Sequence, residues 1–396
     1  MFFLKFFLKK ILPWLLILLL LPAFPRFMRA LPQSTDALIS KRYEGWSGVL
    51  RLWVYEGWQP GNGSLVPWLN QCITAFEKDH SGVYIQLKQV SEQTLKDFAS
   101  PEVRMPDLIL FPPGLIEDAS ALMELDLQAL DANLLPALGA VGMIQGGTRA
   151  LPVAMGGYGW ARNNALLSDW PQDFASAQLL NPKKSSKEAP AALALPPDGD
   201  YLSYSGALIA LLGRENTAPM PIEAREEAPY TAFSNGRVAV MPMTQREMRR
   251  MALLSESGKG PDYTLDADSV CFTDQLALLA LPDTGFSDSP ARKELALAFA
   301  AHLMTADCQQ ALSSVRAFPT IPLEQALYAG VSGYEEMEQA LRSEALRVPT
   351  AFVNSWRASA KSLVEQALSG QISVQSAYLQ FKALFPQPVS PVQTKN

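Results

Sequence analysis

The stretch that decides the fold begins with the apolar, β-rich run Val49-Leu50-Arg51-Leu52-Trp53-Val54-Tyr55, which predicts a largely buried strand. A glycine-rich loop follows at residues 56–63, and Pro67 then suits the first turn of a helix. The apolar residues at 68, 72, 73 and 76 recur with helical spacing. A strand, a glycine-rich loop and a helix in this order indicate the start of an α/β unit.

Two more strands follow along the chain. Residues Val83–Val90 alternate between apolar and polar side chains, which is typical of a strand with one buried face. Residues Leu95–Ala99 are expected to be helical, and Leu108–Phe111 is an apolar run that ends at two prolines. Strands separated by helical crossovers favour a parallel sheet, so the sequence predicts a β-α-β-α-β series.

Such a sheet also predicts where a ligand would bind. Ligands of open α/β sheets collect outside the carboxyl ends of the strands. Glu56 and Trp58 follow the first predicted strand, and Phe111 ends the third. We therefore expect these three side chains to face one crevice.

Composition narrows the possible functions. The chain has 396 residues, 48% of them hydrophobic and 18% charged, which is enough for two or three packed domains. The net charge is −6, although the first 30 residues hold five basic and no acidic side chains. The acidic body argues against a nucleic-acid partner. No glycine-rich nucleotide motif is present, because Gly157-Tyr158-Gly159 is not followed by a third glycine at the required spacing.

Metal and nucleophilic chemistry have little support in the sequence. The chain holds two histidines, His80 and His302, and three cysteines without C-x-x-C spacing. The cysteines are interpreted as small buried apolar residues, His80 as a surface or capping residue, and His302 as an ordinary residue of a helix over Leu295–Met304. G-x-S-x-G is absent, and no acidic pair stands out among many. The sequence therefore predicts no metal, no cofactor and no catalytic residue.

The N-terminus predicts export. Three lysines between residues 5 and 10 precede the apolar run Ile11–Leu21, as in a signal peptide or membrane anchor. Large residues stand three positions before the possible cleavage points, Ala23 and Ala30. We therefore expect residues 1–30 to keep the protein at the outer face of a cytoplasmic membrane. Residues 31–47 are predicted to be a linker and residues 386–396 a flexible tail.

The second half of the chain carries further predicted elements. A turn at Asn235-Gly236 precedes the strand-like run Val238–Met241. Helices are expected at Leu202–Leu212, Leu295–Met304, Ser359–Leu368 and Ser373–Leu384, with Ser373 as an N-cap.

Several of these segments together resemble one family. Residues Phe233–Met241 resemble the motif F-x-x-G-[KR]-x-A-x-M, and Leu297–Thr305 with Gln309 resembles A-x-x-F-x-x-x-L-T-x-x-x-x-Q. The segments Val348–Trp356 and Ala367–Ala377 resemble a closing stretch of the form I-P-x, W, then A-x-x-G-x-x-[ST]-x-x-x-A. In this order, the segments resemble the extracellular solute-binding proteins of ABC importers, specifically the family 1 group that includes maltose-binding protein. The match covers roughly residues 48–384.

The resemblance implies an α/β, two-lobed, periplasmic-binding-protein-like fold with a ligand cleft between the lobes. Lobe 1 would combine residues 48–152 and 283–330, and lobe 2 residues 153–282 and 331–385. The lobes would be joined by Leu151–Gly156 and by a second crossing near Leu279–Pro282. A hinge at these crossings would close the lobes on the ligand.

The resemblance also implies a function without bond chemistry. The protein would be a monomeric, extracytoplasmic receptor that captures a small polar solute, with a sugar or oligosaccharide favoured, and delivers it to an ABC permease in the membrane. Trp356 occupies the place of a cleft tryptophan in maltose-binding protein. The expected ligand-binding residues are Glu56, Trp58, Phe111, Tyr158, Trp160, Thr244, Arg246, Asp274 and Trp356.

Two alternatives remain open at this point. The first is an extracytoplasmic carbohydrate-active enzyme, which would turn over its substrate. The second is a two-lobed envelope sensor or scaffold with no role in transport.

Overall fold

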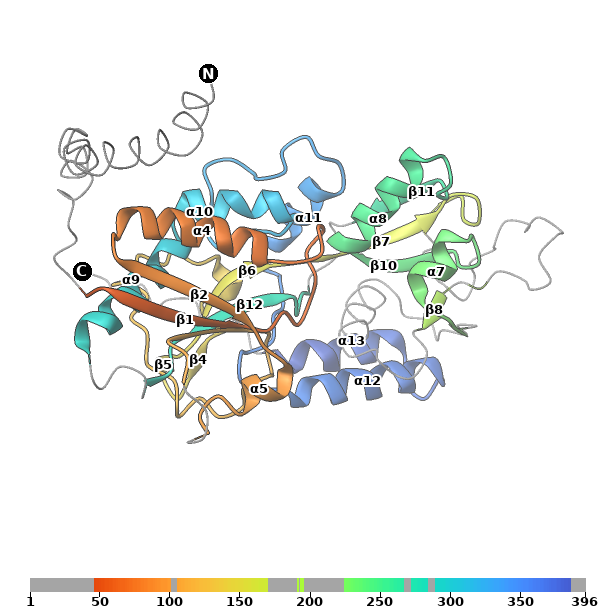
Figure 1. Cartoon of the computed structure of the whole chain (residues 1–396). Coiled ribbons are helices and arrows are strands. Elements are labelled where there is room, and N and C mark those ends of the chain that lie inside the picture. Colours follow the sequence, from red (N-terminus) through yellow and green to blue (C-terminus); the bar gives the residue numbers. More distant parts are fainter. Residues whose placement is uncertain are drawn as a thin grey trace, which may run out of the picture.

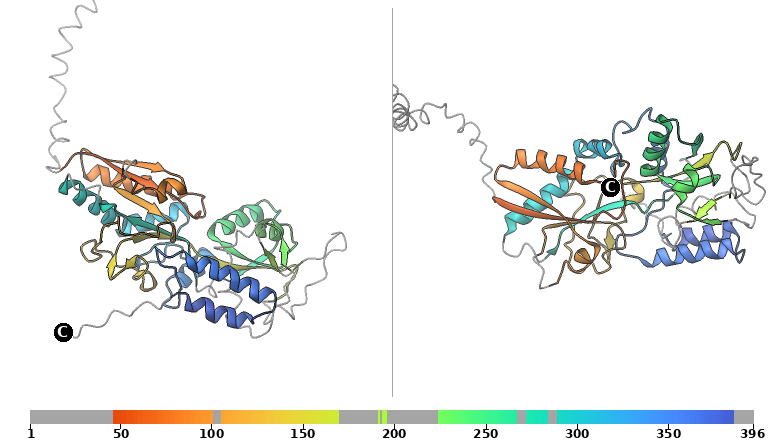
Figure 2. Two further views of the ribbon diagram at one scale, coloured as in Figure 1. Left: turned by 90° about the horizontal axis from the view of Figure 1, so that it is seen from below. Right: turned by 45° about the vertical axis from the view of Figure 1, so that its right-hand side comes forward.

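The computed structural model describes residues 46–100, 105–169, 191, 193–195, 224–266, 272–283 and 289–385. The predicted signal or anchor, most of the linker, the predicted helix Leu202–Leu212 and the tail 386–396 lie outside these residues. Within them the chain forms two α/β lobes that meet near the middle of an elongated molecule (Figures 1 and 2). None of the described helices is long and apolar enough to cross a membrane.

Lobe 1 is built on a five-stranded sheet with the order β2-β1-β3-β12-β6. Its first three strands are β1 (Gly48–Val54), β2 (Val83–Gln89) and β3 (Leu108–Phe111), and β1 pairs in parallel with the other two. This confirms the predicted β-α-β-α-β series, although its second helix lies at Glu92–Lys96 and not at Leu95–Ala99. The sheet is mixed, because β12 (Leu276–Ala280) runs antiparallel to both β3 and β6 (Leu151–Met155).

Helices and loops cover both faces of the lobe 1 sheet at β3, β12 and β6, which are buried at every residue. Leu50 and Leu52 of β1 pack in one core with the apolar stripe of α4 (Val66–Asp79) and with α9 (Pro290–Leu303). Trp53, which points to the other face, belongs to a second core. The remaining elements of this lobe are α5 (Glu92–Lys96), η2 (Pro136–Leu138), β4 (Met143–Ile144), β5 (Gly147–Thr148), α10 (Ala306–Gln310) and η5 (Ala311–Val315).

Lobe 2 contains a three-stranded antiparallel sheet with the order β10-β7-β11. Its strands are β7 (Tyr158–Asn163), β10 (Val240–Thr244) and β11 (Tyr263–Asp266), and a short parallel pair is formed by β8 (Leu193–Leu195) and β9 (Ala224–Glu226). The helices α12 (Ser355–Leu368) and α13 (Val374–Ala383) lie side by side along this lobe (Figure 1). Three more helices complete the described part of the fold: α7 (Pro229–Ser234), α8 (Gln245–Glu256) and α11 (Tyr334–Leu341).

Local sequence signals explain several element boundaries. The Ser373 hydroxyl accepts a hydrogen bond from the N–H of Ser376 at 3.1 Å, so it caps α13 as predicted. Gly236 has a φ of 68°, which allows the chain to turn sharply between α7 and β10. Both helices predicted at Leu295–Met304 and Ser359–Leu368 are present, and each begins several residues earlier than predicted.

The lobe boundaries differ from the prediction. Leu276–Ala280 is fully buried and pairs with strands of the first sheet, so β12 belongs to lobe 1 and not to lobe 2. β6 likewise stays in this sheet as far as Met155. The first crossing therefore occurs at Gly156-Gly157, at the C-terminal end of the predicted segment Leu151–Gly156. The second crossing occurs before β12, where residues 272–275 are described, and not at Leu279–Pro282.

A hydrogen-bond network ties the two crossings together. The N–H of Gly156 donates to the carbonyl of Gln275 at 2.7 Å, and the Thr273 hydroxyl donates to the carbonyl of Gly156 at 2.7 Å. The Gln245 side chain connects this pair to lobe 2: its Nε2 donates to Oε1 of Gln275 at 2.9 Å, and its Oε1 accepts the N–H of Gly157 at 3.1 Å. We call these residues the hinge network.

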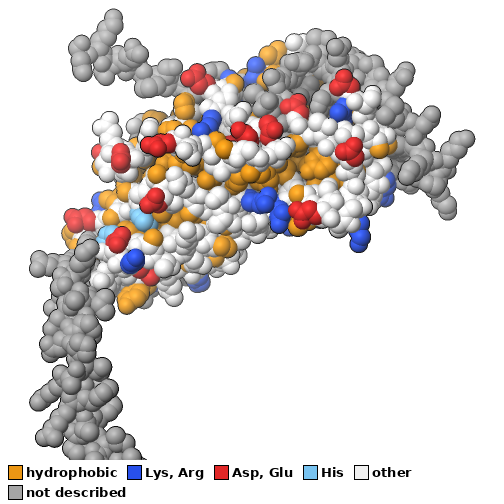
Figure 3. Space-filling view, turned by 90° about the horizontal axis from the view of Figure 1, so that it is seen from above, with side chains coloured by type: hydrophobic (Ala, Val, Ile, Leu, Met, Phe, Trp, Pro, Cys, Tyr) orange, Lys and Arg blue, Asp and Glu red, His pale blue; other side chains and the backbone are white. Residues whose placement is uncertain are grey.

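The surface is mixed in character. On the face shown in Figure 3, hydrophobic side chains form a band across the middle, and acidic and basic side chains are scattered around it. The described side chains of this face thus include both signs of charge, in keeping with the near-equal numbers of basic and acidic residues in the chain.

Candidate functional site

A cavity of about 560 Å³ lies between the two lobes. Lobe 1 contributes the loop that follows β1, and lobe 2 contributes the start of β7, the start of α7, and the junction of β10 with α8. The hinge network contributes Gln275. The residues that line the cavity are Glu56, Gly57, Trp58, Gln59, Tyr158, Ala228, Pro229, Tyr230, Met241, Pro242, Thr244, Arg246, Glu247 and Gln275.

The lobe 1 wall is held by its own hydrogen bonds. The Glu56 carboxylate accepts the Ser64 hydroxyl at 2.9 and 3.1 Å and also accepts the N–H of Leu65, at the point where α4 begins. These contacts satisfy donors at the start of the helix and fix the loop in place. Trp58 is almost fully buried against the core of lobe 1 and leaves only part of its ring at the cavity.

The lobe 2 wall includes the first turn of α8. Thr244 and Glu247 form a capping box, in which the Thr244 hydroxyl accepts the N–H of Glu247 at 3.5 Å and the Glu247 carboxylate accepts the N–H of Thr244 at 3.0 Å. Burial raises the pKa of Glu247, and the two hydrogen bonds from backbone N–H groups oppose this shift. Arg246 is exposed on the same turn, and within the described part of the chain its guanidinium has no hydrogen bond or ion pair.

Two tyrosines complete this wall. The Tyr158 phenol donates to the Asp274 carboxylate at 2.6 Å, and burial next to this carboxylate raises the pKa of Tyr158 well above its ordinary value. Tyr158 is therefore a neutral, fixed ring. The Arg250 guanidinium lies 3.6 Å from the ring centroid of Tyr230, a cation–π contact that restricts the motion of that ring.

Five of the nine predicted ligand-binding residues line the cavity: Glu56, Trp58, Tyr158, Thr244 and Arg246. A sixth, Asp274, is buried behind the wall and holds Tyr158. The structure brings these six together from segments that are distant in sequence.

The other three predicted residues lie elsewhere. Phe111 is fully buried, as is the whole of β3, and packs toward Phe352, with their ring centroids 6.4 Å apart. Trp160 is buried in the core of lobe 2. Trp356 is 3% exposed, and its ring centroid lies 5.8 Å from that of Phe272 and 5.6 Å from that of Phe385. The expected cleft tryptophan is thus a core residue, because the start of α12 faces this aromatic cluster.

Other residues that line the cavity were not among those predicted from the sequence. Tyr230 follows a Pro- and Glu-rich segment with the appearance of a surface loop, and Gln59 lies in the loop of which only Glu56 and Trp58 were singled out. Glu247 was missed although the capping-box pattern T-x-x-E was readable in the sequence. Gln275 carries no recognisable signal, since its place depends on the crossing itself.

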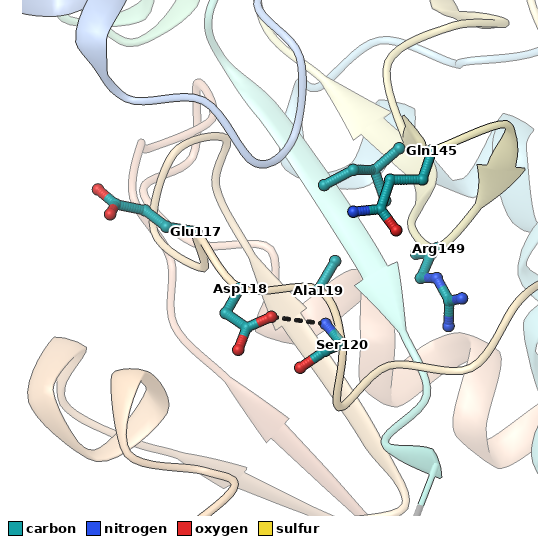
Figure 4. Close-up of a pocket in the computed structure, with 7 residues that line it drawn as sticks. Glu117, Asp118, Ala119, Ser120, Gln145 and Arg149 are labelled. Atoms are coloured by element: carbon teal, nitrogen blue, oxygen red, sulfur yellow. Dashed lines mark hydrogen bonds between the residues drawn. The ribbon is translucent and has the colours of Figure 1, made fainter.

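A smaller cavity of about 380 Å³ lies within lobe 1 (Figure 4). The Asp118 carboxylate accepts the N–H of Ser120 at 2.8 Å, Arg149 donates to the carbonyl of Leu122, and Glu117 points away from the other labelled side chains. Asp118 and Arg149 thus have partners within lobe 1, and all the residues that line this cavity belong to that lobe. We therefore assign the functional site to the cavity between the lobes. The described residues contain no group of three His, Cys, Asp or Glu side chains that could hold a metal ion.

Comparison with known proteins bears on the fold. No protein-family model matches the sequence, and no curated protein matches it. Solved structures do match. A maltodextrin-binding protein of L. casei BL23, solved without ligand, has a TM-score of 0.59 and 13% identity, covering 86% of this chain and 98% of that chain. The chain has the fold of these binding proteins.

Two further structures agree. The cyclic α-maltosyl-1,6-maltose-binding protein of Arthrobacter globiformis has a TM-score of 0.54 and 14% identity, covering 86% of this chain and 98% of that chain. The GacH receptor of Streptomyces glaucescens, solved unliganded and with acarbose, has a TM-score of 0.53 and 16% identity, covering 85% of this chain and 97% of that chain. The likeness extends over nearly the whole length of each structure, so the two-lobed α/β fold is shown for both lobes together.

Proposed function

We propose that this protein is an extracytoplasmic receptor that captures a sugar or oligosaccharide in the cavity between its lobes and delivers it to an ABC permease. The observation that carries this proposal is the composition of the cavity, in which aromatic rings from both lobes stand among hydrogen-bonding groups. Its volume of about 560 Å³ lies in the range that is usual for small-molecule sites. The similar structures are binding proteins for cyclic α-maltosyl-1,6-maltose and for maltodextrin and a receptor that binds acarbose, which supports a carbohydrate as the ligand.

The wall chemistry suits a sugar. The partly exposed ring of Tyr230, with the small parts of the Trp58 and Tyr158 rings that reach the cavity, can pack against sugar C–H groups. Arg246 and the Gln59 side chain can donate to hydroxyl oxygens, while Asp274 keeps the phenol of Tyr158 in place. The ligand would be held by stacking and hydrogen bonds from both lobes at once.

A ligand that contacts both lobes should have a higher affinity for a closed arrangement of the lobes than for an open one. A ligand that touches two walls binds more tightly when the walls approach, and it shifts the population toward that state. The hinge network at Gly156 and Gln275 is the place where such a rotation would occur. A permease that recognises the closed arrangement would then distinguish the loaded receptor from the empty one.

Binding without turnover is part of the proposal. The Glu56 carboxylate holds Ser64 and Leu65 just before α4, and the Glu247 carboxylate belongs to the capping box of α8, so both cavity carboxylates already serve the local fold. Incubating the protein with an oligosaccharide and separating the products by chromatography tests this point. Any protein-dependent appearance of shorter sugars would show an enzyme instead of a receptor.

The main test is calorimetric titration with maltose, maltotriose and other oligosaccharides. Replacing a stacking ring removes affinity, so Tyr230→Ala should weaken binding of the responding sugar about tenfold, or about 1.4 kcal/mol. The matched control is Tyr84→Ala on β2, where the side chain is 62% exposed and far from the cavity residues in lobe 2. Equal affinities of the two variants, or no response to any sugar, would refute the proposal.

A further inference from the structure

Two of the three cysteines meet in the core of lobe 1. Cys72 lies on α4 and Cys308 on α10, and their side chains are 1% and 4% exposed. The two thiols lie close enough to act on each other: the Cys308 side chain raises the pKa of Cys72, and the Cys72 side chain lowers that of Cys308. Both are free cysteines in the structure.

The backbone around the two thiols is fixed from both sides. The indole N–H of Trp68, one turn before Cys72, donates to the carbonyl of Cys308 at 2.7 Å. The imidazole Nε2 of His302 donates to the carbonyl of Cys72 at 3.1 Å. The first bond joins α4 to α10, and the second joins α4 to α9, the helix that directly precedes α10, so groups other than the thiols hold the segments of Cys72 and Cys308 next to each other.

His302 also acts on the thiol chemistry. The pKa of Cys308 is lowered chiefly by the neighbouring Cys72 side chain and also by that of His302. The pKa of His302 is raised, chiefly by the same contact with Cys308. The thiolate form of cysteine is the nucleophile in disulfide exchange, and in the folded chain Cys308 is nearer to this form than Cys72.

We propose that Cys72 and Cys308 form a disulfide bond that ties α4 to α10 when the chain folds outside the cytoplasm. The proposal rests on the extracytoplasmic location in the proposed function but not on sugar binding. A disulfide is expected to persist in such an oxidising compartment, and it would cross-link two parts of lobe 1 that the excursion through lobe 2 separates in sequence.

The chemistry balances as two exchange steps with an external disulfide, either oxidised glutathione or a thiol–disulfide oxidoreductase. The thiolate of one of these two cysteines attacks one sulfur of that disulfide, forms a mixed disulfide and releases the other sulfur as a thiolate, which takes up a proton. The second cysteine then loses its proton and attacks the protein sulfur of the mixed disulfide, and the second external thiol leaves. Two protein thiols are oxidised and one external disulfide is reduced. Because both thiols are buried in the folded protein, the reaction belongs to the folding stage.

The first test maps the bond. The full-length chain, purified in detergent, is denatured with reductant and refolded in a mixture of reduced and oxidised glutathione. It is then alkylated in denaturant without reductant and digested for mass spectrometry. The expected result is a cross-linked peptide pair containing Cys72 and Cys308, with Cys271 alkylated. Three alkylated cysteines, or a major bond that involves Cys271, would overturn the proposal.

The second test compares melting temperatures with and without reductant. A bond that closes so long a loop should raise the melting temperature of the oxidised wild type by several degrees. Cys72→Ala should abolish the difference, and the matched variant Cys271→Ala should keep it. A difference that survives in Cys72→Ala contradicts the assignment. Because no sugar is used, a protein that forms the bond but binds no sugar would support this inference and refute the proposed function.

Discussion

Gly156 is the residue of the crossing between the lobes at which an added methyl group should destabilise the structure most. A Cβ at this residue would fall far inside van der Waals contact with Oε1 of Gln275 and Nε2 of Gln245, and 3.0 Å from Cδ of Gln245. Gly156→Ala must therefore separate these two amides. That separation removes the Gln245–Gln275 hydrogen bond and the bond from Gly157 to Gln245, whose lengths are 2.9 and 3.1 Å.

The cost follows from the loss of two buried hydrogen bonds. Each contributes about 0.5–1.5 kcal/mol, and each buried amide left without a partner costs about 1–3 kcal/mol. We therefore expect Gly156→Ala to lower the free energy of unfolding by about 2–4 kcal/mol. Urea denaturation followed by tryptophan fluorescence measures this quantity.

The matched control is Gly139→Ala. Gly139 has φ −58° and ψ −30°, and a Cβ there would lie 3.8 Å from its nearest neighbour, the carbonyl oxygen of Pro136. An alanine fits this conformation and should leave stability unchanged or raise it by up to about 1 kcal/mol. If both variants unfold at the same urea concentration, the steric reasoning is wrong. In a background with Gln245→Ala and Gln275→Ala, the cost of Gly156→Ala should fall sharply, as a double-mutant cycle would report.

Three further outcomes are expected. Trp356→Ala should lower the free energy of unfolding by about 3–5 kcal/mol, while the folded fraction binds sugar normally. Weaker sugar binding with unchanged stability would show that Trp356 is a ligand-binding residue and not a core residue. Asp107→Asn should cost about 3–5 kcal/mol in a urea titration, since Asp107 is fully buried and pairs with Arg292 at 2.5 Å. Its control is Glu92→Gln, which removes an exposed ion pair with Lys96 and should cost less than about 1 kcal/mol. Equal losses of stability in Asp107→Asn and Glu92→Gln would contradict the larger role given to the buried pair. Small-angle scattering should give a smaller radius of gyration with the bound sugar than without it, and identical values would count against lobe closure.

The elements that sequence analysis located correctly are those with strong local periodicity. β1 and β2 match the predicted strands to within a residue, and α4 follows the apolar spacing from Trp68 to Phe76. The error concerned β12, whose five apolar residues predict a buried strand without indicating which sheet it joins. Its place depends on pairing with β3 and β6, and such non-local contacts leave no signal in the local sequence.

The site was predictable where a residue follows a strand or caps a helix. Glu56 lies just after β1, Thr244 ends β10 and caps α8, and both residues line the cavity. The burial of Phe111, Trp160 and Trp356 away from the cavity could not be predicted in this way. A strand in the middle of a covered sheet is buried on both faces, so its last residue need not reach the crevice. For a tryptophan, aromatic character suits a core and a sugar platform equally well, and only the packing around Trp160 and Trp356 decides.

The position of β12 between β3 and β6 constrains the order in which the chain can fold. Until Leu276–Ala280 has been made and brought back, β3 and β6 each lack a neighbour on that side, and their backbone N–H and C=O groups are open to wrong partners. The loop that must close before these pairs form contains most of lobe 2, so its entropy is lost late and folding should be slow. If the chain leaves an export channel N-terminus first, β3 and β6 would therefore each have an unpaired edge until β12 has also emerged.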